Sequence, residues 1–238
     1  MLAQLFPYDP LVVLGYNAFF VALILLLIFL KKPTSELGRA FLFILIVTPV
    51  FLATLYITGY TLYKISTSAT KGPIHWHADF LVYACGVKID LLDPTGLSNK
   101  VGTPVVHEHG DGRIHIEGIL NNLTEASLGG FFKAVGGSLT NESLSLPMNS
   151  GMVSMKNGDI CPDGTEAELQ VFLWETDKEG YARQRKLSEF SSYLMKGVEL
   201  VPPGDCLVIE FGAKRDRTEY VCEQYTVAEK RGDIEILR

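Results

Sequence analysis

Residues 75–91 read HWHADFLVYACGVKIDL, and they decide the fold of the larger part of this chain. Residues 78–84 and 87–91 are rich in apolar, β-branched and aromatic side chains, and Cys85-Gly86 separates them. Two such runs joined by a two-residue break that contains glycine are typical of a β-hairpin. The stretch therefore predicts a strand-rich domain that begins near residue 75.

The first of these strands carries polar groups on one side. Residues two apart in a strand share a face, so we expect His75, His77 and Asp79 to point one way. Trp76 and Phe80 then point the other way, where a hydrophobic core suits them. The pattern predicts a sheet with a histidine-bearing face and a core-facing side.

A second histidine-rich stretch, residues 107–118, reads HEHGDGRIHIEG. The turn Gly110-Asp111-Gly112 interrupts it and predicts another hairpin. If the turn has three residues, His107 lies opposite His115 and shares its face. A two-residue turn would instead place His115 opposite Glu108, on the other face. Gly112 favours the three-residue form, because the last position of that turn needs the left-handed conformation.

All five histidines of the chain lie between positions 75 and 115. Three imidazoles on one sheet face suit Zn²⁺ or Cu²⁺, so we expect His107, His109 and His115 to bind one divalent ion. His75 and His77 either complete this site or form another. The alternative is a polar face with solvated histidines and no metal. Metal-binding rings need hydrogen-bond acceptors behind them, and the candidates are the carboxylates of Asp79, Glu108, Asp111 and Glu117.

These two stretches, followed by SLGGFFKAVGG at residues 127–137, resemble a family of secreted or membrane-anchored prokaryotic proteins. Its members combine an early H-x-H, an H-x-H-x(5)-H-x-E block and an L-G-x-F-F segment. The resemblance implies that the histidine block is a functional site, and it implies no particular reaction. The two apolar runs near the N-terminus and the cysteines depart from the family pattern. The matching residues are His75, His77, Gly86, His107, His109, Gly112, His115, Glu117, Leu128, Gly129, Phe131 and Phe132.

The rest of the domain is a mixture of strands and short helices. Residues 168–175, 206–212 and 219–226 have the composition of strands. A helix is predicted over residues 125–135 and a short helical turn over 187–194. This order resembles the closing half of a β-grasp domain, in which a short helical turn precedes a final central strand. We therefore expect a β-grasp-like α+β domain, with a β-sandwich as the alternative.

Two long apolar runs precede this domain. Residues 11–30 and 40–63 contain no charged side chain, and about 20 apolar residues cross the hydrocarbon core of a bilayer. The first run is a poor cleavable signal peptide, because no Lys or Arg precedes it and it is longer than about 15 residues. We therefore expect residues 1–63 to be a membrane anchor of two transmembrane helices. Residues 64–74 are then a linker, and residues 75–238 form an external domain.

The connection between the two runs carries the basic residues Lys31, Lys32 and Arg39. Such residues stay in the cytoplasm when they flank membrane helices. Both termini and the domain are therefore expected outside the cytoplasm of a cell-membrane protein with two spans. The expected partners are the lipid bilayer and another membrane protein.

The four cysteines, Cys85, Cys161, Cys206 and Cys222, all follow the apolar runs. An even number of cysteines fits disulfides in an oxidising compartment. In a hairpin that turns near residue 214, Cys206 and Cys222 are direct cross-strand neighbours, which predicts their disulfide. The pair Cys85–Cys161 follows by elimination.

Composition and motifs exclude several functions. The net charge of −6 and the 20% of charged residues argue against nucleic-acid binding. The chain also lacks the glycine-rich motifs that hold nucleotide phosphates. We interpret it as a membrane-anchored extracytoplasmic protein that binds copper or zinc, in metal handling or as an accessory subunit. The alternatives are a metal-dependent extracytoplasmic enzyme and a metal-free structural or interaction module.

Overall fold

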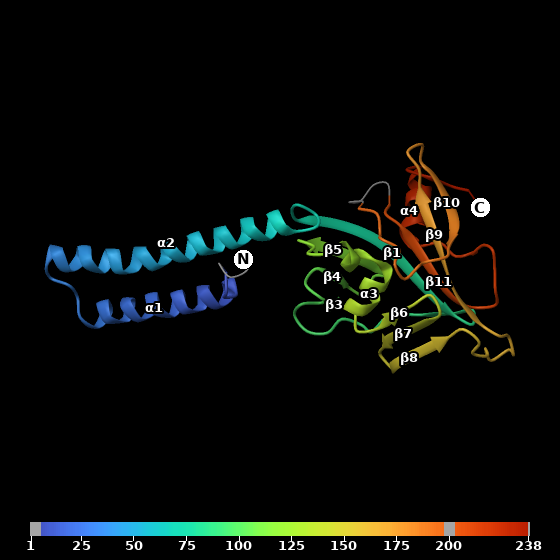
Figure 1. The fold of residues 1–238 in the computed structure, drawn as a ribbon, viewed down its shortest axis with the longest axis horizontal. Coiled ribbons are helices and arrows are strands. Elements are labelled where there is room, and N and C mark those ends of the chain that lie inside the picture. Colours follow the sequence, from blue (N-terminus) through green and yellow to red (C-terminus); the bar gives the residue numbers. More distant parts are fainter. Residues whose placement is uncertain (1–5, 198–202, 238) are drawn as a thin grey trace. The chain divides into compact units, whose positions relative to one another are not determined.

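The computed structural model describes residues 6–197 and 203–237. The chain forms two compact units, Met1–Thr67 and Ser68–Arg238. The first contains a pair of long helices, and the second is a strand-rich domain with short helices (Figure 1). The structure thus has the helical pair and the mixed α/β part that the sequence predicts.

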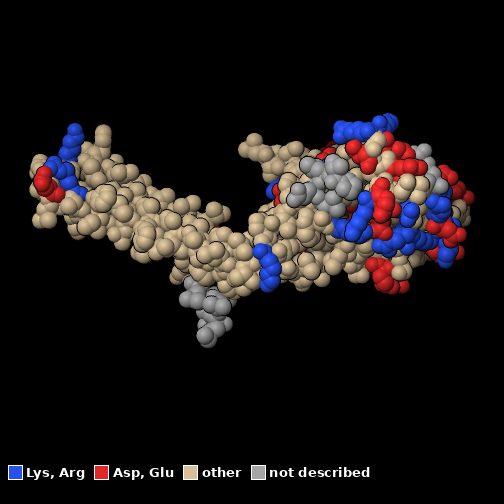
Figure 2. Space-filling view, turned by 90° about the horizontal axis from the view of Figure 1, so that it is seen from above, with Lys and Arg blue, Asp and Glu red and all other residues tan. Residues whose placement is uncertain are grey.

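The helical pair consists of α1 (Pro10–Leu30) and α2 (Glu36–Thr67). Helix α1 begins at Asp9, whose carboxylate accepts a hydrogen bond from the backbone N–H of Leu11 over 2.7 Å. Both helices are long and apolar enough to cross a membrane. In Figure 2 charged side chains gather near the connection between the helices, and most of the visible helical surface carries none, although Lys64 lies in the last turn of α2.

A polar contact joins the two helices. The side-chain amide of Asn17 in α1 donates a hydrogen bond to the carbonyl oxygen of Pro49 in α2 over 2.7 Å. Helix α2 also continues through Thr67, so residues 64–67, which the sequence analysis assigns to the linker, are helical.

The second unit has two sheets and three short helices in its described residues. Its helices are the 3₁₀ helix Leu123–Ala126, α3 (Leu128–Ala134) and α4 (Glu223–Arg231). Its strands are β1 (Ile74–Ala84), β2 (Val87–Ile89), β3 (Val101–Gly102), β4 (Val106–Glu108), β5 (Arg113–Gly118), β6 (Ser138–Leu139), β7 (Ser143–Met148), β8 (Gly151–Lys156), β9 (Glu168–Thr176), β10 (Tyr181–Leu187), β11 (Cys206–Gly212) and β12 (Glu235–Ile236).

The large sheet has the strand order β12-β10-β9-β11-β1-β5-β4-β3, and β2 also pairs with β1. At its centre, β1 runs parallel to β11 and antiparallel to β5. The predicted hairpin of β1 and β2 is confirmed, and its two-residue turn places Cys85 and Gly86 at φ 50° and 81°. Strands β6, β7 and β8 form a separate small sheet.

Alternating residues of the central strands enter two different cores. Val171 of β9 and Ile209 of β11 belong to one hydrophobic cluster, which also contains Phe131 and Phe132 of α3. Their neighbours Phe172 and Val208 belong to a second cluster, which contains Tyr225 of α4. The large sheet is therefore covered on one side by α3 and the small sheet, and on the other side by α4.

Three of the predicted local structures differ from those observed. The helix predicted over residues 125–135 is divided at Ser127, whose extended backbone ends the 3₁₀ helix and caps α3. The helical turn predicted over 187–194 is the end of β10 followed by a non-helical turn. The strand predicted over 219–226 is wrong, because α4 begins there. Buried Tyr225 and Ala228 lie three residues apart, which is helical spacing.

Both predicted disulfides are present, Cys85–Cys161 and Cys206–Cys222. The hairpin used to predict the second one does not form. Cys222 is instead the residue that caps the N-terminus of α4, so this disulfide fastens that helix to the central strand β11. The first disulfide joins the turn after β1 to the connection between β8 and β9.

Candidate metal centre

Three adjacent strands bring the histidines together. His115 of β5 is the direct partner of His77 in β1 and of His107 in β4. The register that follows from a three-residue turn is therefore confirmed. Ile114 and Ile116 are fully buried in the core on the α3 side, so the alternate residue His115 points to the opposite side of the sheet.

The remaining two histidines extend this row along the outer strands. His75 lies two residues before His77, and His109 lies two residues after His107. The result is two groups of three that share His115. In each group, one ring nitrogen from each of the three histidines lies within 4.8 Å of the other two. One group is His75, His77 and His115, and the other is His107, His109 and His115.

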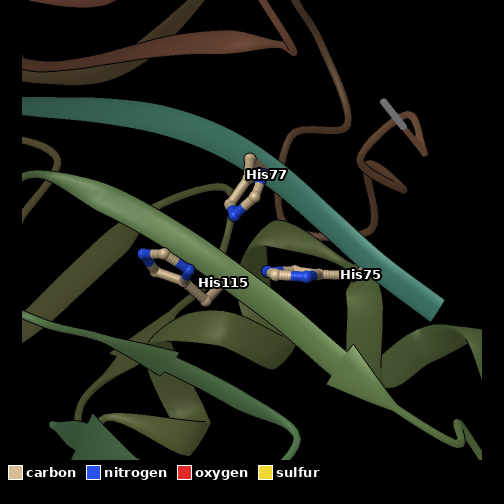
Figure 3. Close-up of side chains that lie close together, drawn as sticks. All are labelled: His75, His77 and His115. Carbon is tan, nitrogen blue, oxygen red and sulfur yellow. The ribbon is translucent and has the colours of Figure 1, made fainter. Parts of the chain in front are cut away.

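The rings pack edge to face around His115. The ring centres of His77 and His109 each lie 4.8 Å from that of His115, nearly at right angles to it. The ring of His107 lies parallel to that of His115 at 5.5 Å. Figure 3 shows the first group, in which His75 and His77 of β1 approach His115 of the neighbouring strand β5.

Several ring nitrogens in the cluster have no hydrogen-bond partner. Both nitrogens of His115, and Nδ1 of His107, are buried and make no hydrogen bond to any described residue. Each such group costs about 1–3 kcal/mol when it is left unpaired. Buried polar atoms are nearly always paired, so three unpaired nitrogens in one cluster call for a ligand. A metal ion is the ligand that binds several neutral imidazoles at once.

Two histidines at the edge of the cluster are held in place by hydrogen bonds. His75 Nε2 lies 3.0 Å from Glu117 Oε1, and His109 Nδ1 contacts the carbonyl oxygen of Asn99. A neutral imidazole that donates from one nitrogen has a lone pair on the other. These contacts therefore leave Nδ1 of His75 and Nε2 of His109 with a lone pair that is not used by the contact. The role of Asn99 was missed by sequence reasoning, because a backbone carbonyl leaves no signature in the residue type.

Two of the four predicted supporting carboxylates lie beside the cluster. Besides its contact with His75, Glu117 places Oε1 3.8 Å from His115 Nδ1 and Oε2 3.9 Å from His107 Nε2. On the other side of the shared ring, Asp111 Oδ2 lies 3.8 Å from His115 Nε2. The shared histidine therefore has a carboxylate near each of its two nitrogens.

The other two predicted carboxylates are used elsewhere. Asp79 is buried and accepts a hydrogen bond of 2.8 Å from Nε of Arg113, so its partner is this guanidinium rather than an imidazole. Glu108 accepts hydrogen bonds from the backbone N–H groups of Asp111 and Gly112, at 2.7 and 3.0 Å. Its Oε1 thus stabilises the turn between β4 and β5, whereas its Oε2 is buried and makes no hydrogen bond to any described residue.

Burial keeps the inner histidines neutral. Loss of hydration, together with a smaller effect of the neighbouring His77, lowers the pKa of His115 to about 4. Burial likewise lowers the pKa of His107, with a contribution from Lys100. A metal ion binds the neutral form of imidazole, so both rings are in their binding form throughout the physiological pH range.

This shift predicts how the metal-free protein responds to acid. The pKa of His115 lies below its value of about 6.5 in the unfolded chain, so the unfolded state binds the proton first. The contribution of His115 to the free energy of unfolding is fully present above pH 6.5. It falls by about 3 kcal/mol as the pH decreases toward 4. Urea unfolding of the metal-free protein at several pH values measures the effect. A His115→Phe variant is expected to lose this part of the slope, and an unchanged slope would refute the assignment.

Comparison of the chain with models of known protein families, with curated proteins and with solved structures finds no match. The site is therefore defined by its own geometry. It is a set of five imidazoles from three strands, with inner rings shielded from solvent and one carboxylate on each side of the shared ring.

Proposed function

We propose that this protein is a membrane-anchored extracytoplasmic metal-binding protein, which holds copper or zinc through its histidine cluster. The observation that carries the proposal is the set of unpaired, buried nitrogens on His115 and His107. Such a site suits metal handling, or an accessory subunit that supplies metal to another membrane protein.

The donor set decides the kind of metal. Imidazole nitrogens suit Zn²⁺ and Cu²⁺, whereas Mg²⁺ and Ca²⁺ prefer oxygen ligands. Nitrogens that bind a tetrahedral Zn²⁺ at about 2.0–2.1 Å lie roughly 3.3 Å apart. The nitrogens in each group lie within 4.8 Å of one another. Side-chain rotations that move each nitrogen by about 1 Å bring them to the spacing that an ion requires.

A second candidate function, that of a metal-dependent enzyme, is favoured by the open edge of the cluster. The side chain of His75 is 62% exposed and that of Glu117 is 40% exposed, whereas that of His107 is 2% exposed. A metal ion bound at this edge keeps a position for water or a substrate, which is the arrangement of catalytic zinc sites. Spectra of the Co²⁺-substituted protein distinguish the two functions: an exchangeable water favours the enzyme, and a closed set of protein ligands favours metal handling.

The proposal predicts metal in the protein as isolated. The full-length chain, purified in detergent without a histidine tag and without chelators, is expected to contain copper or zinc by elemental analysis. The metal-depleted protein is expected to take up Zn²⁺ or Cu²⁺ again in a calorimetric titration. Absence of binding to the folded protein would refute the proposed function.

The proposed topology has its own test. The basic residues Lys31, Lys32 and Arg39 motivate a cytoplasmic connection between α1 and α2, with the domain outside. All four native cysteines are in disulfides, so one added cysteine gives a clean signal. A membrane-impermeant maleimide is expected to label Lys214→Cys in intact cells, and Ser35→Cys only after permeabilisation. Labelling of Ser35→Cys in intact cells would contradict the topology.

The strand order supports a β-grasp-like arrangement for the domain. The first strand β1 and the late strand β11 lie side by side and parallel at the centre of the sheet, and each has an antiparallel partner on its outer side. The chain segment with α3 connects the two halves and packs on one face. A likeness of fold carries no function, so the proposed activity depends on the histidines alone.

A further inference from the structure

His115 belongs to both groups of histidines, and one imidazole has two nitrogens. From this arrangement we infer that the cluster is a two-metal centre, in which the ring of His115 bridges two divalent transition-metal ions. The inference rests on the proposed function, because it assumes that the cluster binds metal. It differs from a single site with five ligands in the number of ions and in the role of the central ring.

The strand order supplies two equivalent half-sites. Strand β5 lies between β1 and β4, and His115 is the partner of a histidine on each side. Strand β1 adds His75, two residues before His77 on the same face, and His109 follows directly after the end of β4, two residues beyond His107. Each half-site thus contains an H-x-H pair and shares the ring in the middle. The pairs are His75 with His77 and His107 with His109.

The two nitrogens of His115 have different surroundings. Nδ1 lies 3.8 Å from Glu117 Oε1, the oxygen that also contacts His75 Nε2. Nε2 lies 3.8 Å from Asp111 Oδ2, on the other side of the ring. Both nitrogens are buried and have no hydrogen-bond partner among the described residues. The lone pairs of one imidazole ring diverge, so one ion cannot take both nitrogens, and two ions take one each.

The charges of the site permit two ions to bind on either side of the His115 ring. With about 2.0 Å from each nitrogen to its metal, an imidazole bridge holds the ions roughly 6 Å apart. The second ion replaces the ring N–H proton of His115, which passes to water, and the bridging ring becomes an anion. Each ion lies about half as far from this anion as from the other ion, so the two attractions outweigh the repulsion. The carboxylates of Glu117 and Asp111 add negative charge on either side.

The hydrogen bonds of the two outer rings, His75 and His109, are consistent with a two-metal centre. His75 contacts Glu117 through Nε2, and His109 contacts the carbonyl oxygen of Asn99 through Nδ1, so each outer ring has one nitrogen engaged by an oxygen. Metal-binding histidines commonly donate from the other nitrogen to a carboxylate or a carbonyl, because this fixes the ring and raises its basicity. Both half-sites therefore have such an orienting partner.

The test is a titration of the full-length, metal-depleted protein with Cu²⁺, without a histidine tag. Native mass spectrometry is expected to show two ions per chain. Electron paramagnetic resonance is expected to show a mononuclear signal after the first equivalent, which weakens as the second equivalent binds. Two Cu²⁺ ions joined by an imidazolate couple their spins, and this loss of signal is specific to a bridge.

Two double variants each remove the H-x-H pair of one half-site and leave the other pair in place. His75→Ala/His77→Ala and His107→Ala/His109→Ala are each expected to bind one ion, with a full uncoupled signal. Circular dichroism of both variants checks that they fold.

The outcomes separate this inference from the proposed function. One ion in the wild-type chain, or two ions with the full uncoupled signal, would overturn the bridge while metal binding stands. No Cu²⁺ bound to the folded wild-type protein would overturn both the bridge and the proposed function.

Discussion

Replacing His115 with Phe is expected to abolish metal binding and, at the same time, to stabilise the metal-free protein. Phe has a ring of similar size and no nitrogen, so both half-sites lose a ligand without a large cavity. Loss of a residue that hydrogen-bonds to a metal ligand lowers metal affinity by about 10- to 100-fold. We expect a larger loss here, because the ligand itself is removed. Removal of two buried, unpaired nitrogens is expected to raise the free energy of unfolding by about 1–3 kcal/mol.

His75→Phe is the matched control for this substitution. It removes a ligand from one half-site, and at a largely exposed position it relieves no buried polar atom. We therefore expect a smaller loss of metal uptake and no gain in stability. Calorimetric titration with Zn²⁺ and urea unfolding of the metal-free proteins measure both effects. Tight binding by the folded His115→Phe variant would show that the shared histidine is not a ligand.

Removal of the disulfide Cys85–Cys161 is expected to destabilise the domain more than removal of Cys206–Cys222. The first closes a loop with a sequence separation of 76 residues, and the second a separation of 16. Loop-closure entropy predicts costs of between about 4 and 4.7 kcal/mol for the first and about 3 kcal/mol for the second. Urea unfolding of the two Cys→Ala double variants, compared with wild type, measures the difference.

Metal binding by these two variants shows whether they are folded but less stable, or unfolded. Neither disulfide contributes a residue to the two histidine groups, so a variant that remains folded is expected to bind metal as wild type does. The reverse order of the two stability losses would mean that the attachment of α4 to β11 matters more than the loop that each bond closes.

The hairpins and the histidine face could be predicted because they depend on local rules. Alternation along β1 places His75 and His77 on one face, and the glycine turn before β5 places His107 opposite His115, whereas the pairing of β1 with β5 that joins the two pairs has no such local signal. The pairing of β1 with β11 brings together segments more than a hundred residues apart, and the sequence has no local signal for it. The residues that form α4 include Tyr, Thr and Val, which favour strands, beside good helix formers such as Glu, Ala and Lys, so composition alone does not decide between strand and helix.

The supporting residues of the site were harder to predict for a related reason. The carboxylates near the histidines are all plausible partners in sequence, and their hydrogen bonds decide between them. Asp79 is paired by Arg113, and Glu108 by two backbone N–H groups of the turn. Such choices depend on side-chain geometry across strands, which the spacing of residues does not determine.

The central position of β1 has a consequence for the biosynthesis of the protein. Its neighbour on one side, β5, lies nearby in the sequence, whereas its neighbour on the other side, β11, is synthesised more than a hundred residues later. The segment that contains β1, β4, β5 and all five histidines is therefore synthesised before β11, which pairs with β1 at the centre of the sheet. If the histidines bind metal as proposed, all five of these ligands are available to ions before the domain is complete, so metal loading and completion of the fold are separable in time. A metal-bound β1–β5–β4 segment would then offer a preformed edge on which β11 docks.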